Sequence, residues 1–201
     1  MDTKRTIQQA AQATIGMLAL LIVLTSSPTH ALDETTPVRT LDGVRLHEPN
    51  PQREEMLDWA LKQYRAAGLQ MPTIDVYFHG DSSGCGGYLG YTKKGRVDLC
   101  VRLAMERQPQ RIVLHELAHA WAEVHLDEEL RTRFMQLRNL PGWNITSDDW
   151  KVRGTEQAAE IIAWGLGDGT VLPMISGDCD PSALADGFLL LTGSQPVHDG
   201  I

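Results

Sequence analysis

The sequence lacks the features that mark several classes of protein. The chain of 201 residues contains no C-x-x-C pair, no internal repeat and no low-complexity segment, which argues against zinc-finger, repeat and disordered architectures. Basic residues are scarce: 18 Lys and Arg stand against 26 Asp and Glu, a net charge of −8. Binding to nucleic acid or to an anionic membrane draws on a basic surplus, so we expect neither as a partner.

A long apolar run occurs only once, at residues 15–24 (IGMLALLIVL). It follows the basic start MDTKR and precedes SSPTHA, where small residues permit a signal-peptidase cut after Ala31. We therefore expect residues 1–31 to be a signal peptide. Residues 32–201 would form a single domain, secreted or otherwise extracytoplasmic, with no stable membrane association after cleavage and a net charge of −9. Retention of the segment as an N-terminal anchor is the alternative.

Cysteine is also rare, with three residues in the chain, Cys85, Cys100 and Cys179. An exported protein folds in an oxidising compartment, where cysteines ordinarily pair. The segment CGGYLGYTKKGRVDLC is typical of two strands around a Lys94-Gly95 turn, which would bring Cys85 and Cys100 opposite each other. We predict a Cys85–Cys100 disulfide, with Cys179 free.

The order of expected elements indicates an α+β fold. Asn50-Pro51 starts a helix that Gly68 ends, after an extended lead-in at 32–49. Strand-forming residues at 73–78 and within 84–101 predict a small antiparallel sheet. Further helices are expected at 109–126, 128–140, 156–166 and 182–191, the last three capped by Asp127, Thr155 and Asp180, with a frayed tail behind them.

The stretch RIVLHELAHAW, residues 111–121, places His115, Glu116 and His119 in an H-E-x-x-H pattern within a helix-forming run. Two residues four positions apart on a helix lie on the same face, about 40° apart in projection, so both imidazoles can bind one metal ion. Glu116 lies beside that face, close to a water at the metal without being a ligand. This is the position that a general base needs.

Composition alone explains the pattern poorly. With 7 His and 11 Glu in the chain, chance produces it in roughly 1 of 100 such chains. Ile112, Leu117 and Trp121 give the helix an apolar side. Two histidines and a glutamate on a half-buried helix are costly without a partner, so the pattern predicts a metal site.

HELAHAW resembles the signature of the zincin metallopeptidases. The resemblance implies a zincin-like fold, a Zn²⁺ cofactor, hydrolysis of peptide bonds and Glu116 as the general base. The later segment GTEQAAEIIAWGL resembles the gluzincin branch, in which a Glu on a later helix is the third ligand. By that likeness Glu156 binds zinc and Glu160 orients one of the zinc histidines, although the branch often has Asp at this position. Alternatively, Glu156, Gln157 and Glu160 form the solvated stripe of an otherwise apolar helix.

His125 is the alternative metal ligand, because HELAHAWAEVH has the spacing of the metzincin branch and Met174 could imitate the methionine of its turn. That branch has Gly three residues after the second His, where the helix breaks. This chain has Ala122 there, a strong helix former. If the helix continues, His125 lies about 240° round from His119 and faces away from the metal, so Glu156 is the preferred third ligand.

Two functions of different classes follow. The first is an exported zinc-dependent peptidase that acts on a peptide or protein substrate. Residues 85–167 also resemble small exported bacterial proteins that are labelled as metallopeptidases. The second is a secreted zinc-binding structural or binding module without catalysis, closed by a fourth protein ligand such as His79 or Asp81. Glu116 favours the peptidase, because a structural zinc site needs no carboxylate at that position.

Overall fold

The structure, a computed structural model, describes residues 36–102, 109–147 and 149–198. The signal peptide expected at residues 1–31 lies outside the described residues. Within the described part, no helix is both long enough and apolar enough to cross a bilayer.

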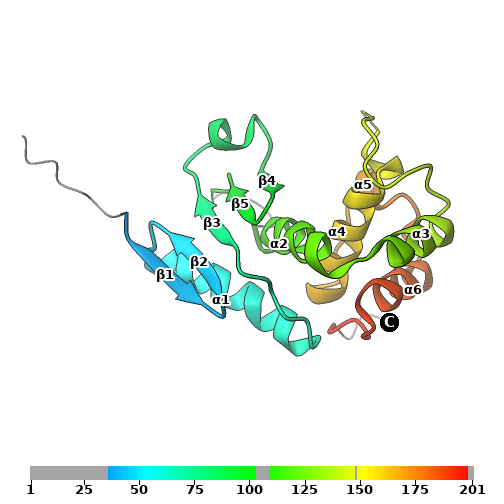
Figure 1. Ribbon diagram of the computed structural model, residues 1–201, viewed down its shortest axis with the longest axis horizontal. Coiled ribbons are helices and arrows are strands. Elements are labelled where there is room, and N and C mark those ends of the chain that lie inside the picture. The colour runs from blue at the N-terminus through cyan, green and yellow to red at the C-terminus, as the bar shows by residue number, and fades with distance from the viewer. Residues whose placement is uncertain (1–35, 103–108, 148, 199–201) are drawn as a thin grey trace, which may run out of the picture. The chain divides into compact units, whose positions relative to one another are not determined.

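The fold is α+β, with one five-stranded sheet and six α-helices among the described residues (Figure 1). The strands are β1 (Val38–Leu41), β2 (Val44–His47), β3 (Asp75–Phe78), β4 (Gly90–Lys93) and β5 (Arg96–Leu99), in the spatial order β1-β2-β3-β5-β4. The helices are α1 (Pro51–Ala66), α2 (Pro109–His125), α3 (Glu128–Leu137), α4 (Gly154–Leu166), α5 (Pro173–Ser176) and α6 (Pro181–Thr192). Two 3₁₀ turns, η1 (Ser82–Cys85) and η2 (Trp150–Val152), complete the list.

The sheet is mixed, which corrects the expectation of an antiparallel one. β3 runs parallel to both of its neighbours, β2 and β5, whereas the outer pairs β1–β2 and β4–β5 are antiparallel. The expected extended lead-in at 32–49 is also wrong, because residues 38–47 form a hairpin that joins the sheet. Its turn is Asp42-Gly43, with both φ angles positive, and α1 then crosses over to β3, a connection that makes the two strands parallel.

Side-chain caps define three of the expected helix starts. Asn50, Asp127 and Asp180 each accept a backbone N–H at the first turn of α1, α3 and α6. α4 differs, because it starts at Gly154 rather than after Thr155, and Arg153 gives it no side-chain cap. Instead, the first N–H groups of α4 donate to the carbonyls of residues 142 and 143, each at 3.1 Å, which ties the preceding loop to the helix.

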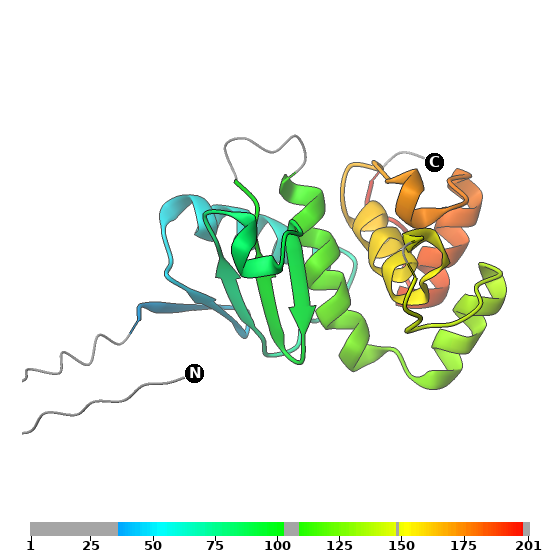
Figure 2. The same ribbon diagram turned by 90° about the horizontal axis from the view of Figure 1, so that it is seen from above.

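Helix α2 lies at the centre of the fold. Figure 2 shows it between the sheet and the later helices, and it packs on β4 and β5 with one side and on α4 with the other. Eleven of its 17 residues are buried, among them His115 and Glu116. Buried polar groups are costly without partners, so His115 and Glu116 need protein or ligand atoms to bind.

The Cys85–Cys100 disulfide is confirmed, with a Cα–Cα distance of 6.1 Å. Cys85 lies in η1 rather than in a strand, so the Gly-rich start of this segment is a turn and the hairpin around Lys94-Gly95 begins later. Cys179 is the free thiol in the described part of the chain. The tail is not frayed as far as it is described, because Val197 N–H donates to the Gly165 carbonyl at 2.8 Å.

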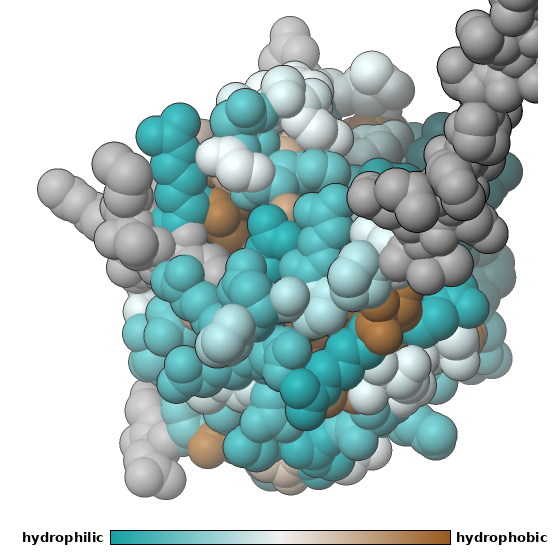
Figure 3. Space-filling view, turned by 90° about the vertical axis from the view of Figure 1, so that its left-hand side faces the viewer, coloured by the Kyte–Doolittle hydropathy of each residue, from teal (hydrophilic) through white to brown (hydrophobic). Residues whose placement is uncertain are grey.

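The sheet has two unlike faces. Its inner face carries buried Leu46, Val76 and Leu99, and its outer face carries polar side chains from β2, β3 and β5. The side of the molecule in Figure 3 is mostly hydrophilic, with small and separate apolar spots among the coloured residues. The buried polar groups of the H-E-x-x-H motif lie instead in α2.

Candidate metal centre

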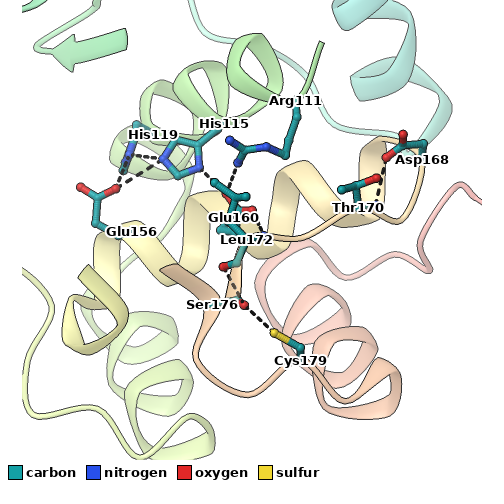
Figure 4. Close-up of polar contacts among 10 residues, drawn as sticks. All are labelled: Arg111, His115, His119, Glu156, Glu160, Asp168, Thr170, Leu172, Ser176 and Cys179. Atoms are coloured by element: carbon teal, nitrogen blue, oxygen red, sulfur yellow. Dashed lines mark hydrogen bonds and ion pairs between the residues drawn. The ribbon is translucent and has the colours of Figure 1, made fainter. Parts of the chain in front are cut away.

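His115 and His119 lie on the face of α2 that meets α4. Their Nε2 atoms are 3.2 Å apart and their rings are nearly perpendicular, at 83°. Figure 4 shows both rings turned toward the first turn of α4, where Glu156 lies. The four-residue spacing in a helix thus brings the two histidines together as predicted.

Glu156 completes a compact triangle of donor atoms. Its Oε2 lies 3.4 Å from the Nε2 of His115 and 3.4 Å from the Nε2 of His119. Three ligands at about 2.0–2.1 Å from a tetrahedral ion lie roughly 3.3 Å from one another. The edges of the triangle, 3.2, 3.4 and 3.4 Å, have that size.

A buried oxygen without a donor supports the same conclusion. Glu156 Oε2 is inaccessible to solvent and has no hydrogen-bond partner. A carboxylate oxygen in such a place is costly, and an unseen ion is one of the few physical reasons for it. His115, His119 and Glu156 can therefore hold a metal ion, and among the described residues no fourth His, Cys, Asp or Glu joins this group.

Glu160 holds His115 from behind. It is fully buried, and its Oε2 accepts hydrogen bonds from His115 Nδ1 at 3.0 Å and from Arg111 at 2.6 Å. Its Oε1 accepts the backbone N–H of Leu172 at 2.7 Å. Because Nδ1 of His115 donates to Glu160, Nε2 is free to act as a metal ligand, and Figure 4 shows this nitrogen on the side of His119 and Glu156. The surface-stripe alternative for this residue is therefore wrong.

The charges of the group are strongly coupled. Burial lowers the pKa of His115, but the close contact with the Glu156 carboxylate and the hydrogen bond to Glu160 outweigh it and raise the pKa to about 10. Burial raises the pKa of Glu156, but the close contacts with the two imidazoles hold that pKa well below its usual range. Without a metal the site therefore keeps protons on imidazole beside ionised carboxylates, and a metal ion must displace protons to bind.

Glu116 lies outside the triangle and contacts β4. Thr92 Oγ1 lies 2.8 Å from Glu116 Oε2 and 3.0 Å from the Glu116 carbonyl oxygen. Gly90 leaves the space that this side chain fills, because a Cβ at position 90 would lie 2.3 Å from Glu116 Cγ. β4 thus fixes the carboxylate beside the metal group but outside it.

A cavity of about 920 Å³ opens over the group. His115, Glu116, His119 and Glu156 line it, together with β4 on one side and with the loop before α4 and α5 on the other. Figure 1 shows these segments on opposite sides of α2. The size is that of a small-molecule or peptide site, with polar groups converging on one point of the wall.

The other candidate ligands lie elsewhere. α2 continues unbroken past Ala122, and the His125 ring stacks on Trp121 at 4.9 Å between centroids. Met174 lines the cavity but is mostly exposed. His79 pairs with Asp98 at 2.6 Å, and Asp81 caps η1 by accepting the Ser83 N–H. None of the three candidate ligands, His125, His79 and Asp81, belongs to the His115–His119–Glu156 group.

Sequence reasoning missed the residues that support the site. Arg111 and Leu172 complete the bonding of Glu160, and Gly90 and Thr92 hold Glu116. Arg111 stands one turn before His115 in the same helix, and that spacing is the one signal in the sequence that could have suggested it.

Comparisons of the chain with protein-family models, with curated proteins and with solved structures found no match. The likeness to zincins therefore depends on the H-E-x-x-H motif and on the residues that surround it.

Proposed function

We propose that this protein is an exported zinc-dependent peptidase. The observation that carries the proposal is the donor triangle of His115, His119 and Glu156, which opens to a cavity with Glu116 beside it. Two imidazoles and one carboxylate are a donor set that zinc takes in catalytic sites, where three protein ligands leave one position open. The Cys85–Cys100 disulfide fits an extracytoplasmic location.

A zinc ion in the triangle would supply Lewis acidity, which activates water and polarises a carbonyl group. Glu116 would act as the general base, taking a proton from the attacking water and delivering it to the leaving amine. The hydroxyl of Thr92 donates to Glu116 Oε2, and this contact keeps the carboxylate in one orientation. Glu160 keeps His115 in the tautomer that presents Nε2 to the metal.

The free edge of β4 offers a place for an extended substrate. Cys100 N–H donates to the Leu89 carbonyl, so residues 89, 91 and 93 direct their backbone groups toward β5. The backbone groups of Gly90 and Thr92 then face outward, because β4 is the last strand of the sheet. An added peptide strand would hydrogen-bond to these groups beside the cavity, which presents a peptide bond to the site without reading its side chains.

Replacement of Glu116 by Gln tests the proposal. Because Glu116 is not in the donor triangle, the variant should bind zinc as the wild type does and should lose cleavage of a mixed peptide library by about 10²–10⁴-fold. Mass spectrometry of the digested library measures activity, and the metal content of the purified protein measures zinc. Glu129→Gln, an exposed change on α3, is the matched control and should leave both unchanged.

Undiminished cleavage by Glu116→Gln would contradict the assigned base. Absence of any cleavage by a zinc-loaded wild type would favour the alternative of a zinc-binding module without catalysis.

A further inference from the structure

The basic side chains that lack a carboxylate partner gather at the cavity. Eight of the described Lys and Arg residues make ion pairs with Asp or Glu. Seven do not, in the part of the chain that the structure describes: Lys93, Lys94, Arg102, Arg131, Arg133, Arg138 and Arg153. Four of these seven, Lys93, Lys94, Arg131 and Arg153, line the cavity, against one of the eight paired ones, Arg111. A chain with a net charge of −8 has thus placed four of its seven unpaired basic residues of the described part around one site.

Two of the four are held in place by tryptophan rings. The Arg131 guanidinium lies over the Trp143 ring, 5.5 Å from its centroid, and that of Arg153 lies over the Trp150 ring at 4.5 Å. Each guanidinium makes one hydrogen bond, to a backbone carbonyl, and its Nε is buried without a partner. A guanidinium stacked on an aromatic face keeps its in-plane N–H edge free for a planar anion such as a carboxylate.

The acidic groups of the cavity do not neutralise these arginines. Glu156 lies in the donor triangle and Glu116 is bonded to Thr92. Glu123, the third acidic residue on the wall, is exposed and makes no ion pair, and it gives Arg131 only its backbone carbonyl. The wall opposite β4 is therefore positive and carries unused donors.

We infer that the cavity selects substrates that bear a carboxylate, which Arg131 and Arg153 bind. The carboxylate is that of an acidic side chain or of the C-terminus of the peptide. This inference rests on the proposed peptidase function, to which it adds a substrate class. Lys93 and Lys94, which are exposed at the end of the hairpin, attract anionic peptides at longer range, and salt screens their effect more.

Matched peptides test the inference with zinc-loaded protein. One pair differs by Glu against Gln near the cleaved bond, and the other by a free C-terminus against a C-terminal amide. We expect kcat/KM to be about tenfold higher for the charged member of at least one pair, and the pair that responds identifies the source of the carboxylate. In Arg131→Gln the ratio of kcat/KM for the charged peptide to that for the neutral one should fall to a value between about one and about three. Arg133→Gln, on the same helix, unpaired and outside the cavity, should keep the wild-type ratio.

A second readout needs no catalysis. The affinities of the same peptides for zinc-loaded Glu116→Gln protein, measured by calorimetry, should show the same preference of about tenfold. Equal affinity and equal kcat/KM for both members of both pairs would overturn the inference and leave the peptidase proposal standing. Tenfold tighter binding of charged peptides without any cleavage by the wild type would support the inference and contradict the peptidase.

Discussion

Histidines meet carboxylates in two regions of this molecule, with different outcomes. On the outer face of the sheet, Asp75 accepts two bonds from Arg45, at 2.8 and 2.5 Å, and one from His47 at 2.7 Å. Asp98 is bound in the same way by Arg96 and His79. Between α2 and α4, by contrast, Glu156 Oε2 lies 3.4 Å from two imidazole nitrogens and has no hydrogen-bond partner.

The difference teaches which clusters are structural and which call for a ligand. An arginine that bonds both oxygens of a carboxylate satisfies it, and nothing more is needed there. In the α2–α4 group the arginine, Arg111, bonds Glu160 instead, so Glu160 is satisfied and Glu156 is not. Residue types alone do not separate the two regions, but the bonding of each oxygen does.

Of the changes considered for the two regions, Gly90→Ala should have the largest effect, a loss of peptide cleavage. The new Cβ would lie 2.3 Å from Glu116 Cγ, so the glutamate must swing away from Thr92 while the donor triangle is untouched. Peptide cleavage should fall by about 10²-fold with zinc content unchanged. Gly80→Ala, where a Cβ meets nothing within 4 Å, is the matched control, and an equal loss of activity in both variants would contradict this role of Gly90.

Glu160→Gln sharpens the contrast with the sheet. Gln cannot keep the charge-assisted bonds to His115 and Arg111, so zinc affinity should fall by about 10–100-fold. Competition with a chelating dye measures the affinity. Asp75→Asn, the corresponding change in the outer cluster, should leave zinc affinity unchanged, and a similar fall in both variants would remove the distinction between the two regions.

The pH dependence of the two regions should also differ. In the metal-free protein the pKa of His115 is raised to about 10. The stability that its protonated form contributes is therefore complete below the ordinary histidine pKa of ~6.5 and is lost as the pH rises from there through about 10. Zinc needs the unprotonated nitrogen, so the rise in Tm that zinc causes should grow between about pH 6 and 8.5. Thermal unfolding with and without zinc measures this, and a zinc effect that shrinks over that range would contradict it.

The smallest effect is expected from Asp75→Asn, which should lower the thermal stability only slightly. Hydrogen bonds from Arg45 hold the pKa of Asp75 below its usual range, so its contribution is present above the ordinary value and is lost as the pH falls below it. The pair is partly exposed to solvent, so Tm at neutral pH should fall by no more than about a few degrees. The difference from wild type should vanish near pH 2, and a difference that persists there would show that the ion pair is not its cause.

The sequence predicted what is encoded locally. The H-E-x-x-H spacing placed both histidines on one face of α2, and Lys94-Gly95, with both φ angles positive, formed the expected hairpin turn. The disulfide followed from that hairpin and from two cysteines, although η1 rather than a strand carries Cys85. Ala122 was sufficient to indicate that α2 would carry His125 past the metal face.

Contacts between segments far apart in the sequence could not be predicted from local sequence patterns. The link from Glu160 to the Leu172 N–H, and the packing of Glu116 under Gly90 and Thr92, depend on how α4 and β4 dock on α2. The parallel pairing of β2 with β3 was missed for a related reason. Two four-residue strands give little periodicity, and the direction of pairing is set by the crossover through α1.

The measurement that tests the central claim most directly is the zinc content of the purified protein, compared with that of Glu156→Ala and His125→Ala, with folding checked by circular dichroism. The donor triangle predicts about one zinc ion per chain in the wild type and in His125→Ala, and almost none in folded Glu156→Ala. Zinc retained by Glu156→Ala and lost by His125→Ala, or a folded wild type that takes up no zinc when loaded, would contradict it.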